Sequence, residues 1–82
     1  MAQQARVEEV AAVLKDRGQH VTPDFRMKPP ATAFVVGVPQ ERLRKWRSEG
    51  RGPRYYKGAG PIWYSIHDVL DWLEAQAINP DE

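Results

Sequence analysis

The sequence predicts a small, mainly helical domain with one short β-hairpin, and three observations support this fold class. Apolar residues recur at helical spacing near both ends of the chain. Between them, one glycine separates two segments of helical character, and a glycine-rich turn separates two short aromatic runs. The chain has 82 residues, which is enough for one hydrophobic core but not for two. We therefore expect one small domain with a short appended element.

The first helix is expected over residues 5–17, with a stop at Gly18. Its apolar side chains have the i, i+3, i+4, i+7 spacing of one helix face, and these are Val7, Val10, Ala11 and Leu14. A helix of this length is marginal on its own in water, so it must dock on the rest of the chain or on a second copy. We assign residues 1–25 to this amphipathic helix and the linker that follows it.

A pair of helices is expected in the middle of the chain. A proline-containing connector leads to it, and the alternation over residues 25–27 is enough for a very short edge strand. The double proline that follows suits the first turn of a helix, because proline there loses no needed donor. That helix ends at Gly37, and a second one begins near Pro39 and ends before Gly50. Two helices joined by a tight, glycine-containing turn form a helix-turn-helix.

A hairpin and a last helix complete the expected fold. Residues 54–64 contain two short aromatic and β-branched runs around a glycine turn, which predicts a β-hairpin. Ser65 and Asp68 have the spacing of a capping box at the start of a helix. The inward stripe of that helix is expected to be Ile66, Val69, Leu70, Leu73 and Ala77. We assign residues 26–78 to the main domain and residues 79–82 to a frayed tail.

The overall net charge of +1 hides a strongly basic middle segment. Residues 26–64 carry nine basic and two acidic side chains, whereas residues 65–82 carry five acidic side chains and no lysine or arginine. A basic segment of this kind is the electrostatic footprint of a nucleic-acid-binding protein. The alternative interpretation is a solvated face whose charges pair with the acidic ends of the chain.

The candidate contact residues lie on the second helix of the pair and on the hairpin. With Leu43 and Trp46 facing the core, this helix turns its polar residues outward at about 100° per residue. Arginine and glutamine can bond base edges, whereas lysine more often meets a phosphate. The alternative is an ordinary solvated helix face. The residues expected to contact DNA are Gln40, Glu41, Arg44, Lys45, Arg47, Ser48, Arg54, Tyr56 and Lys57.

These residues are expected to divide into two roles. Base readout is expected from the first half of the helix, namely from Gln40, Glu41 and Arg44. Phosphate contacts are expected from Lys45, Arg47, Arg54 and Lys57. Among the tyrosines, Tyr55 and Tyr64 are expected to fill the core, which leaves Tyr56 as the exposed one.

The sequence offers no catalytic or metal-binding constellation. There are no cysteines, and the two histidines, His20 and His67, lie far apart in the chain. Residues 58–60 form a Gly-Ala-Gly turn without the Lys-Ser/Thr of a phosphate loop. We therefore expect a protein that is not an enzyme and that uses no cofactor or metal. There is no apolar run long enough to span a membrane and no signal-peptide pattern, so no membrane partner is expected.

The stretch GVPQERLRKWRSEGRGPRYYK, continuing to IWYSIHDVLDWL, resembles the winged helix-turn-helix domains of phage excisionases and their MerR-like relatives. The matching positions are Gly37-Val38, Lys45-Trp46, Glu49-Gly50, Gly52-Pro53, Tyr64, Asp68-Val69 and Trp72-Leu73. The resemblance covers residues 27–77. Pro39 stands where the family usually has Ser or Thr, and the hairpin tip lacks the basic residues that the family usually has there.

The resemblance implies sequence-specific binding of double-stranded DNA, with residues 39–48 in the major groove and the hairpin as the wing. It also implies a recombination directionality factor, which bends DNA, steers an integrase towards excision and catalyses no strand exchange itself. The expected partners are double-stranded DNA and an integrase, with self-association either on DNA or through the first helix. The expected location is the cytoplasm of a bacterial host cell, in association with the nucleoid.

Other functions stay open at this point. A dimeric phage or bacterial transcriptional regulator of the same fold would pair through the first helix and bind inverted half-sites. More distant alternatives are a protein-interaction module, which would use the first helix or the acidic tail, and the small subunit of a DNA-packaging machine.

Overall fold

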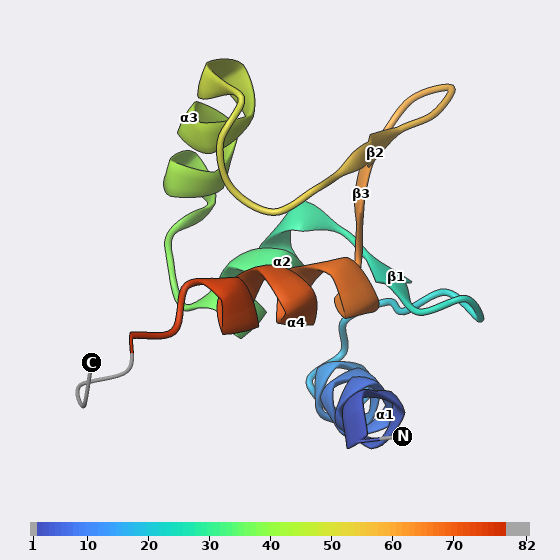
Figure 1. The fold of residues 1–82 in the computed structure, drawn as a ribbon. Coiled ribbons are helices and arrows are strands. Elements are labelled where there is room, and N and C mark those ends of the chain that lie inside the picture. The colour runs from blue at the N-terminus through green and yellow to red at the C-terminus, as the bar shows by residue number, and fades with distance from the viewer. Residues whose placement is uncertain (1, 79–82) are drawn as a thin grey trace.

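Residues 2–78 are described by a computed structural model. This part of the chain forms four helices and three strands (Figure 1). The helices are α1 (Ala2–Asp16), α2 (Pro29–Val36), α3 (Gln40–Glu49) and α4 (Ile66–Ala75), and the strands are β1 (Arg26–Met27), β2 (Tyr56–Lys57) and β3 (Ile62–Ser65). The predicted class is confirmed to the extent that the fold is mainly helical with a small antiparallel sheet.

The sheet joins the predicted hairpin to the predicted edge strand. Its strand order is β1-β3-β2, and β3 pairs antiparallel with both neighbours. Met27 lies opposite Tyr64, and Tyr56 lies opposite Trp63. Because successive side chains of a strand point to opposite faces, Met27 and Tyr64 share the inner face of the sheet, whereas Tyr56 and Trp63 share its outer face. The hairpin therefore has one side towards the core and one away from it.

The core lies between α1, α2, α4 and the inner face of the sheet. Its buried side chains are Val7, Ala11, Leu14, Val21, Met27, Ala31, Tyr64, Ile66, Val69 and Leu70. The predicted apolar stripe of α1 is confirmed, and this helix packs against α4. The first helix thus docks on the rest of the chain, and side chains from both regions that the sequence separates at residue 25 contribute to one core.

The last helix begins as predicted but ends earlier than predicted. Its first turn is capped by Ser65, whose Oγ accepts a hydrogen bond from the backbone N–H of Asp68 at 3.4 Å. The helix ends at Ala75, and Ala77 is exposed, so the prediction that Ala77 belongs to the inward stripe is wrong. The helical period no longer orients a side chain once the backbone has left the helix. The predicted frayed tail, residues 79–82, lies outside the described residues.

The turn between α2 and α3 sets the direction of α3. Gly37 ends α2 in the left-handed region, with φ of 86°, and its N–H donates to the carbonyl oxygen of Ala33 at 2.8 Å. Pro39, which precedes α3, has no side-chain group that could cap the helix. Figure 1 shows α3 and the tip of the β2–β3 hairpin at one end of the molecule and α1 at the opposite end.

Candidate nucleic-acid interface

One side of α3 is polar and faces the solvent. Leu43 is fully buried and Trp46 is half-buried, so both face inward as the helical spacing predicts. The exposed candidate residues of α3 are Gln40, Glu41, Arg44, Lys45 and Ser48. The hydroxyl of Ser48 donates to the carbonyl oxygen of Lys45 at 2.9 Å, within the same helix. The solvent-facing side of α3 therefore presents the cations Arg44 and Lys45 among polar side chains.

Arg47 differs from the other candidate residues of α3 because it is half-buried. Its Nη1 donates a hydrogen bond of 2.9 Å to the hydroxyl of Tyr64, and Tyr64 is only 1% exposed. The guanidinium also lies 5.9 Å from the centre of the Tyr55 ring. Arg47 thus connects α3 to β3. Helical spacing alone gave no signal of this contact, since the two residues belong to different elements.

Trp46 fixes the opposite side of α3. Its ring lies 5.4 Å from the ring of Trp72 in α4, measured between ring centres. Gly52 lies against the side chain of Trp46, so close that a Cβ at Gly52 would be 2.9 Å from Cε3 of the indole. Gly52 also has φ of 86°, which side chains disfavour. The loop after α3 and the last helix together hold Trp46, and through it they set the tilt of α3.

In the hairpin, the structure reverses the predicted roles of two tyrosines. Tyr55 is 38% exposed rather than in the core, and Tyr56 is half-buried rather than exposed. Tyr56 lies on the outer face of the sheet, where its hydroxyl donates to Oδ2 of Asp68 in α4 at 2.8 Å. Tyr55 precedes the strand and only flanks Tyr64, with ring centres 6.1 Å apart. The prediction that Tyr64 fills the core is confirmed.

Tyr56 holds two guanidinium groups beside its ring. Arg26 lies 4.7 Å and Arg54 lies 5.4 Å from the ring centre, within the range of a cation–π contact. The hydrogen bond to Asp68 raises the pKa of Tyr56 above its ordinary value of 10.0, because ionisation would remove the donor and place a second negative charge beside the carboxylate. At neutral pH the hydroxyl is therefore protonated and engaged, and Tyr56 positions cations rather than offering its own hydroxyl.

Strand pairing brings two further cations to the hairpin. Arg26 belongs to β1 and also pairs with Asp24 at 3.3 Å. Lys28 follows β1, and its Nζ lies 5.5 Å from the centre of the Trp63 ring. The sequence placed both residues in the basic segment but not at the hairpin. Only the pairing of β1 with β3 could have indicated their position.

The basic side chains of the site do not pair with the acidic end of the chain among residues 2–78. The ion pairs in this part are Arg26 with Asp24 and Arg51 with Glu49, both at 3.3 Å. Neither pair uses an acidic residue of α4. The candidate site residues that carry a positive charge outside these pairs are Arg44, Lys45, Arg47, Arg54 and Lys57. The described residues therefore do not show the pairing that the solvated-face interpretation requires.

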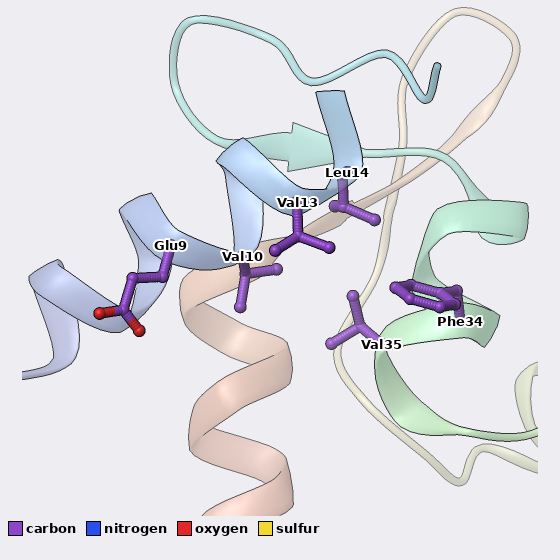
Figure 2. Close-up of a pocket in the computed structure, with 6 residues that line it drawn as sticks. All are labelled: Glu9, Val10, Val13, Leu14, Phe34 and Val35. Carbon is purple, nitrogen blue, oxygen red and sulfur yellow. The ribbon is translucent and has the colours of Figure 1, made fainter. Parts of the chain in front are cut away.

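A second surface feature is a hollow between α1 and α2, which Figure 2 shows from close by. It has a volume of about 420 Å³ and is lined by Glu9, Val10, Val13, Leu14, Phe34 and Val35. Val10 and Val13 of α1 point towards Val35 of α2 across it (Figure 2). Val13 is 50% exposed, and Phe34, whose ring is covered in part by Arg17, is 47% exposed. This hollow uses neither α3 nor the hairpin.

Comparisons with known proteins give no further guide, since no family model matches the chain and no curated protein matches it either. Among residues 2–78, no three side chains of the metal-ligating types His, Cys, Asp and Glu gather closely enough to hold an ion. No helix in the same range combines the length and apolar character needed to cross a bilayer. The features of the molecule that bear on function are therefore α3 and the hairpin.

Proposed function

We propose that this protein binds double-stranded DNA sequence-specifically, as a winged helix-turn-helix protein without catalytic activity. The observation that carries the proposal is that α3 and the tip of the β2–β3 hairpin lie at the same end of the molecule (Figure 1), and that the exposed cations of these two elements form no ion pair with the acidic residues of α4. In this reading α2 and α3 are the helix-turn-helix, and the hairpin is the wing. A ten-residue helix such as α3 fits the major groove of B-DNA.

The proposed mechanism separates docking from reading. Lys45, Arg54 and Lys57 contact phosphates and release bound counterions, which supplies the part of the affinity that is independent of sequence. Base edges are read by the first half of α3, because the N-terminal residues of a recognition helix reach the bases. The side chains placed there are Gln40, Glu41 and Arg44. Arg47 keeps α3 at a fixed angle to the wing through Tyr64.

Within this class we propose an excisionase, a recombination directionality factor. The support is the combined spacing of Gly37-Val38, Trp46, Gly52-Pro53 and Trp72-Leu73, which resembles that family. Trp46 packs on Trp72 and against Gly52, so these positions form one structural unit. In this role the protein binds repeated sites, bends the DNA and favours excision by an integrase.

The test is selection of sheared DNA from the source genome by the purified protein, followed by sequencing of the retained fragments. Direct repeats beside an integrase attachment site would support the excisionase. An inverted repeat at a promoter would support a regulator of the same fold. Absence of any enrichment, together with absence of salt-sensitive binding to bulk DNA, would contradict the proposal and favour a protein-interaction module.

A dimeric transcriptional regulator is the second candidate, and the hollow between α1 and α2 is the observation that favours it. Glu9 and Val13 lie along one side of α1, and Arg17 continues this four-residue spacing in the turn that follows the helix, where its N–H donates to the carbonyl oxygen of Val13 at 3.1 Å. An antiparallel two-fold pairing centred on Val13 would place Glu9 of each copy opposite Arg17 of the other. The apolar hollow, with Glu9 at its edge and Arg17 beside it on the ring of Phe34, would then be self-complementary, as an interface between two identical copies must be.

Exchange of the two charges tests this second candidate by sedimentation equilibrium on the full chain. Glu9→Arg and Arg17→Glu should each weaken the dimer, and the double variant should restore it. Glu8→Arg is the control, because Glu8 is exposed and does not line the hollow, so this variant should leave the dimer intact. If the wild-type protein stays monomeric at all concentrations, both free and bound to DNA, the proposal of a dimeric regulator is contradicted.

A further inference from the structure

We propose that a second hollow, between α3 and the loop that follows it, seats a phosphate of the DNA backbone. This inference rests on the DNA-binding function proposed above and assigns new residues to it. The hollow has a volume of about 310 Å³ and is lined by Arg42, Lys45, Trp46, Glu49 and Arg51. Its charged side chains are three cations and one carboxylate, so it carries a net positive charge.

The hollow lies on the Trp46 side of α3, whereas Arg47 reaches β3 from the other side of the helix. Leu43 marks the buried centre of the helix. On one side of this centre Arg47 reaches β3, and on the other side Trp46 packs on α4. At about 100° per residue, Arg42 falls on the same side as Trp46. Arg42 and the hollow therefore lie on the side of α3 opposite the one from which Arg47 reaches β3.

This position is where a second DNA strand would pass. The major groove is bordered by two phosphate backbones, and a helix lying in the groove turns one side towards each of them. The hairpin provides Arg54 and Lys57 for the backbone on its own side. Arg42 and Arg51 join Lys45 as the cations available for the opposite backbone. The recognition helix is thereby held from both sides of the groove.

The loop that supplies Arg51 is held firmly to α3. The backbone N–H of Arg51 donates to the carbonyl oxygen of Trp46 at 2.7 Å, and Gly50 makes the turn in the left-handed region with φ of 72°. Gly52 rests against the indole of Trp46. The side chain of Arg51 donates from Nη1 to Oε1 of Glu49 at 3.3 Å. Arg51 is thus positioned before DNA arrives, while Glu49 offsets part of its charge.

The experiment measures binding of the full chain to a short, fluorescein-labelled duplex of mixed sequence by fluorescence anisotropy at several salt concentrations. Arg42→Ala and Arg51→Ala should each reduce the slope of log affinity against log salt by about 1. Glu49→Gln should raise the affinity at low salt, because it removes a negative charge and keeps an acceptor for Arg51. Arg6→Ala is the matched control, since Arg6 is exposed on α1 and should leave the slope unchanged.

The same series includes Lys57→Ala, which belongs to the proposed function and not to this inference. A reduced slope for Lys57→Ala with unchanged slopes for both Arg42→Ala and Arg51→Ala would overturn the second phosphate seat alone. A wild-type protein that does not bind the duplex would overturn the DNA-binding function and the seat with it. Circular dichroism spectra of the variants that match the wild-type spectrum show that a reduced salt slope does not come from unfolding.

Discussion

Nη1 of Arg47 donates a 2.9 Å hydrogen bond to the hydroxyl of Tyr64, and this bond ties the proposed recognition helix to the central strand of the sheet. Tyr64 is buried, whereas Arg47 stands next to the exposed side of α3. The bond therefore connects the hydrophobic core to the surface that would meet DNA. Together with the packing of Trp46 on Trp72, it fixes the angle between α3 and the wing.

Arg47→Ala should destabilise the fold and weaken specific DNA binding without changing its salt dependence. The substitution leaves the buried hydroxyl of Tyr64 without its partner, which costs about 1–3 kcal/mol of the free energy of unfolding. Tyr64→Phe removes the same bond and leaves no unsatisfied hydroxyl, so it should cost less. Both variants should lower the affinity for the enriched DNA site, because both loosen α3. Urea unfolding and salt-dependent anisotropy measure the two effects.

Tyr55→Phe is the control for these variants, because Tyr55 is the more exposed tyrosine and its hydroxyl is not the partner of Arg47. If Arg47→Ala alone reduces the salt slope by about 1 while Tyr64→Phe does not, Arg47 contacts a phosphate directly. Arg47 would then be one of the phosphate contacts, as its place in the basic segment predicts.

Arg44→Ala should reduce the preference for the specific site. Arg44 is exposed on α3 and outside the ion pairs of residues 2–78, so its guanidinium is available to a base edge. Losing a bidentate base contact costs about 1–3 kcal/mol of binding free energy on the specific duplex and little on a duplex of mixed sequence. Competition anisotropy with both duplexes gives the difference, with Arg6→Ala as the control. Equal weakening on both duplexes would make Arg44 a phosphate contact.

Lys45→Ala, Arg54→Ala and Lys57→Ala should lower affinity for all sequences to a similar extent. Each replaces one phosphate contact, so each should reduce the salt slope by about 1. Lys15→Ala removes an exposed lysine of α1 at the opposite end of the molecule and should leave the slope unchanged. If a variant has the same salt slope as Lys15→Ala, the residue that it replaces lies outside the interface.

Gly52→Ala should destabilise the protein more than Gly50→Ala does. Both glycines have positive φ, so alanine is strained at either position by about 1–2 kcal/mol. At Gly50 a Cβ meets open space, whereas at Gly52 it would lie 2.9 Å from Cε3 of Trp46. The crowding adds about 1–3 kcal/mol and should push Trp46 away from Trp72. Urea unfolding measures the loss in the free energy of unfolding for each variant, and near-ultraviolet circular dichroism follows the packing of Trp46 on Trp72.

Equal destabilisation of the two variants, with an unchanged tryptophan spectrum, would show that the loop relaxes without moving Trp46. In that case the tilt of α3 would not depend on the contact between Gly52 and the indole. The comparison is sharp because the two positions share their backbone strain and differ in what surrounds the added methyl group.

Local spacing was enough to predict the helices and the capping of α4, because these depend on neighbours three or four residues away. The cap formed by Ser65 on the N–H of Asp68 is such a case. The sides of the hairpin were not predictable in this way, since a shift of one residue in register moves every side chain to the other face. The register places Tyr56 opposite Trp63 and within reach of Asp68, whereas Tyr55 precedes the strand and stays exposed, so the predicted roles of the two tyrosines are reversed.

The candidate site shows the same division between local and distant information. The exposed positions of α3, such as Arg44 and Lys45, follow from helical period once Leu43 is placed in the core. The contact between Arg47 and Tyr64 joins elements that are separate in the chain, and no local pattern encodes it. The approach of Gly52 to the indole of α3 likewise depends on how the loop folds back.

Tyr56→Phe should lower stability at neutral pH and have no such effect at high pH. The hydrogen bond to Asp68 raises the pKa of Tyr56 above 10.0 in the folded state, so the folded protein holds this proton more tightly than the unfolded chain does. The stabilisation is therefore fully present below pH 10 and is lost as the pH rises through the raised pKa. Urea unfolding over a pH series, with Tyr55→Phe as the control, measures the difference.

A difference between wild type and Tyr56→Phe that already shrinks in the neutral range would mean that another group controls the contact, and the assignment to the phenol would be wrong. The same variant also separates two roles of Tyr56 in DNA binding. Phenylalanine keeps the ring beside Arg26 and Arg54 and removes only the hydroxyl, so the salt slope should match that of the wild type. Tyr56→Leu removes the ring as well and should weaken binding, because the two guanidinium groups lose the surface that positions them. Equal affinities for the Phe and Leu variants would show that the ring does not position these cations for DNA.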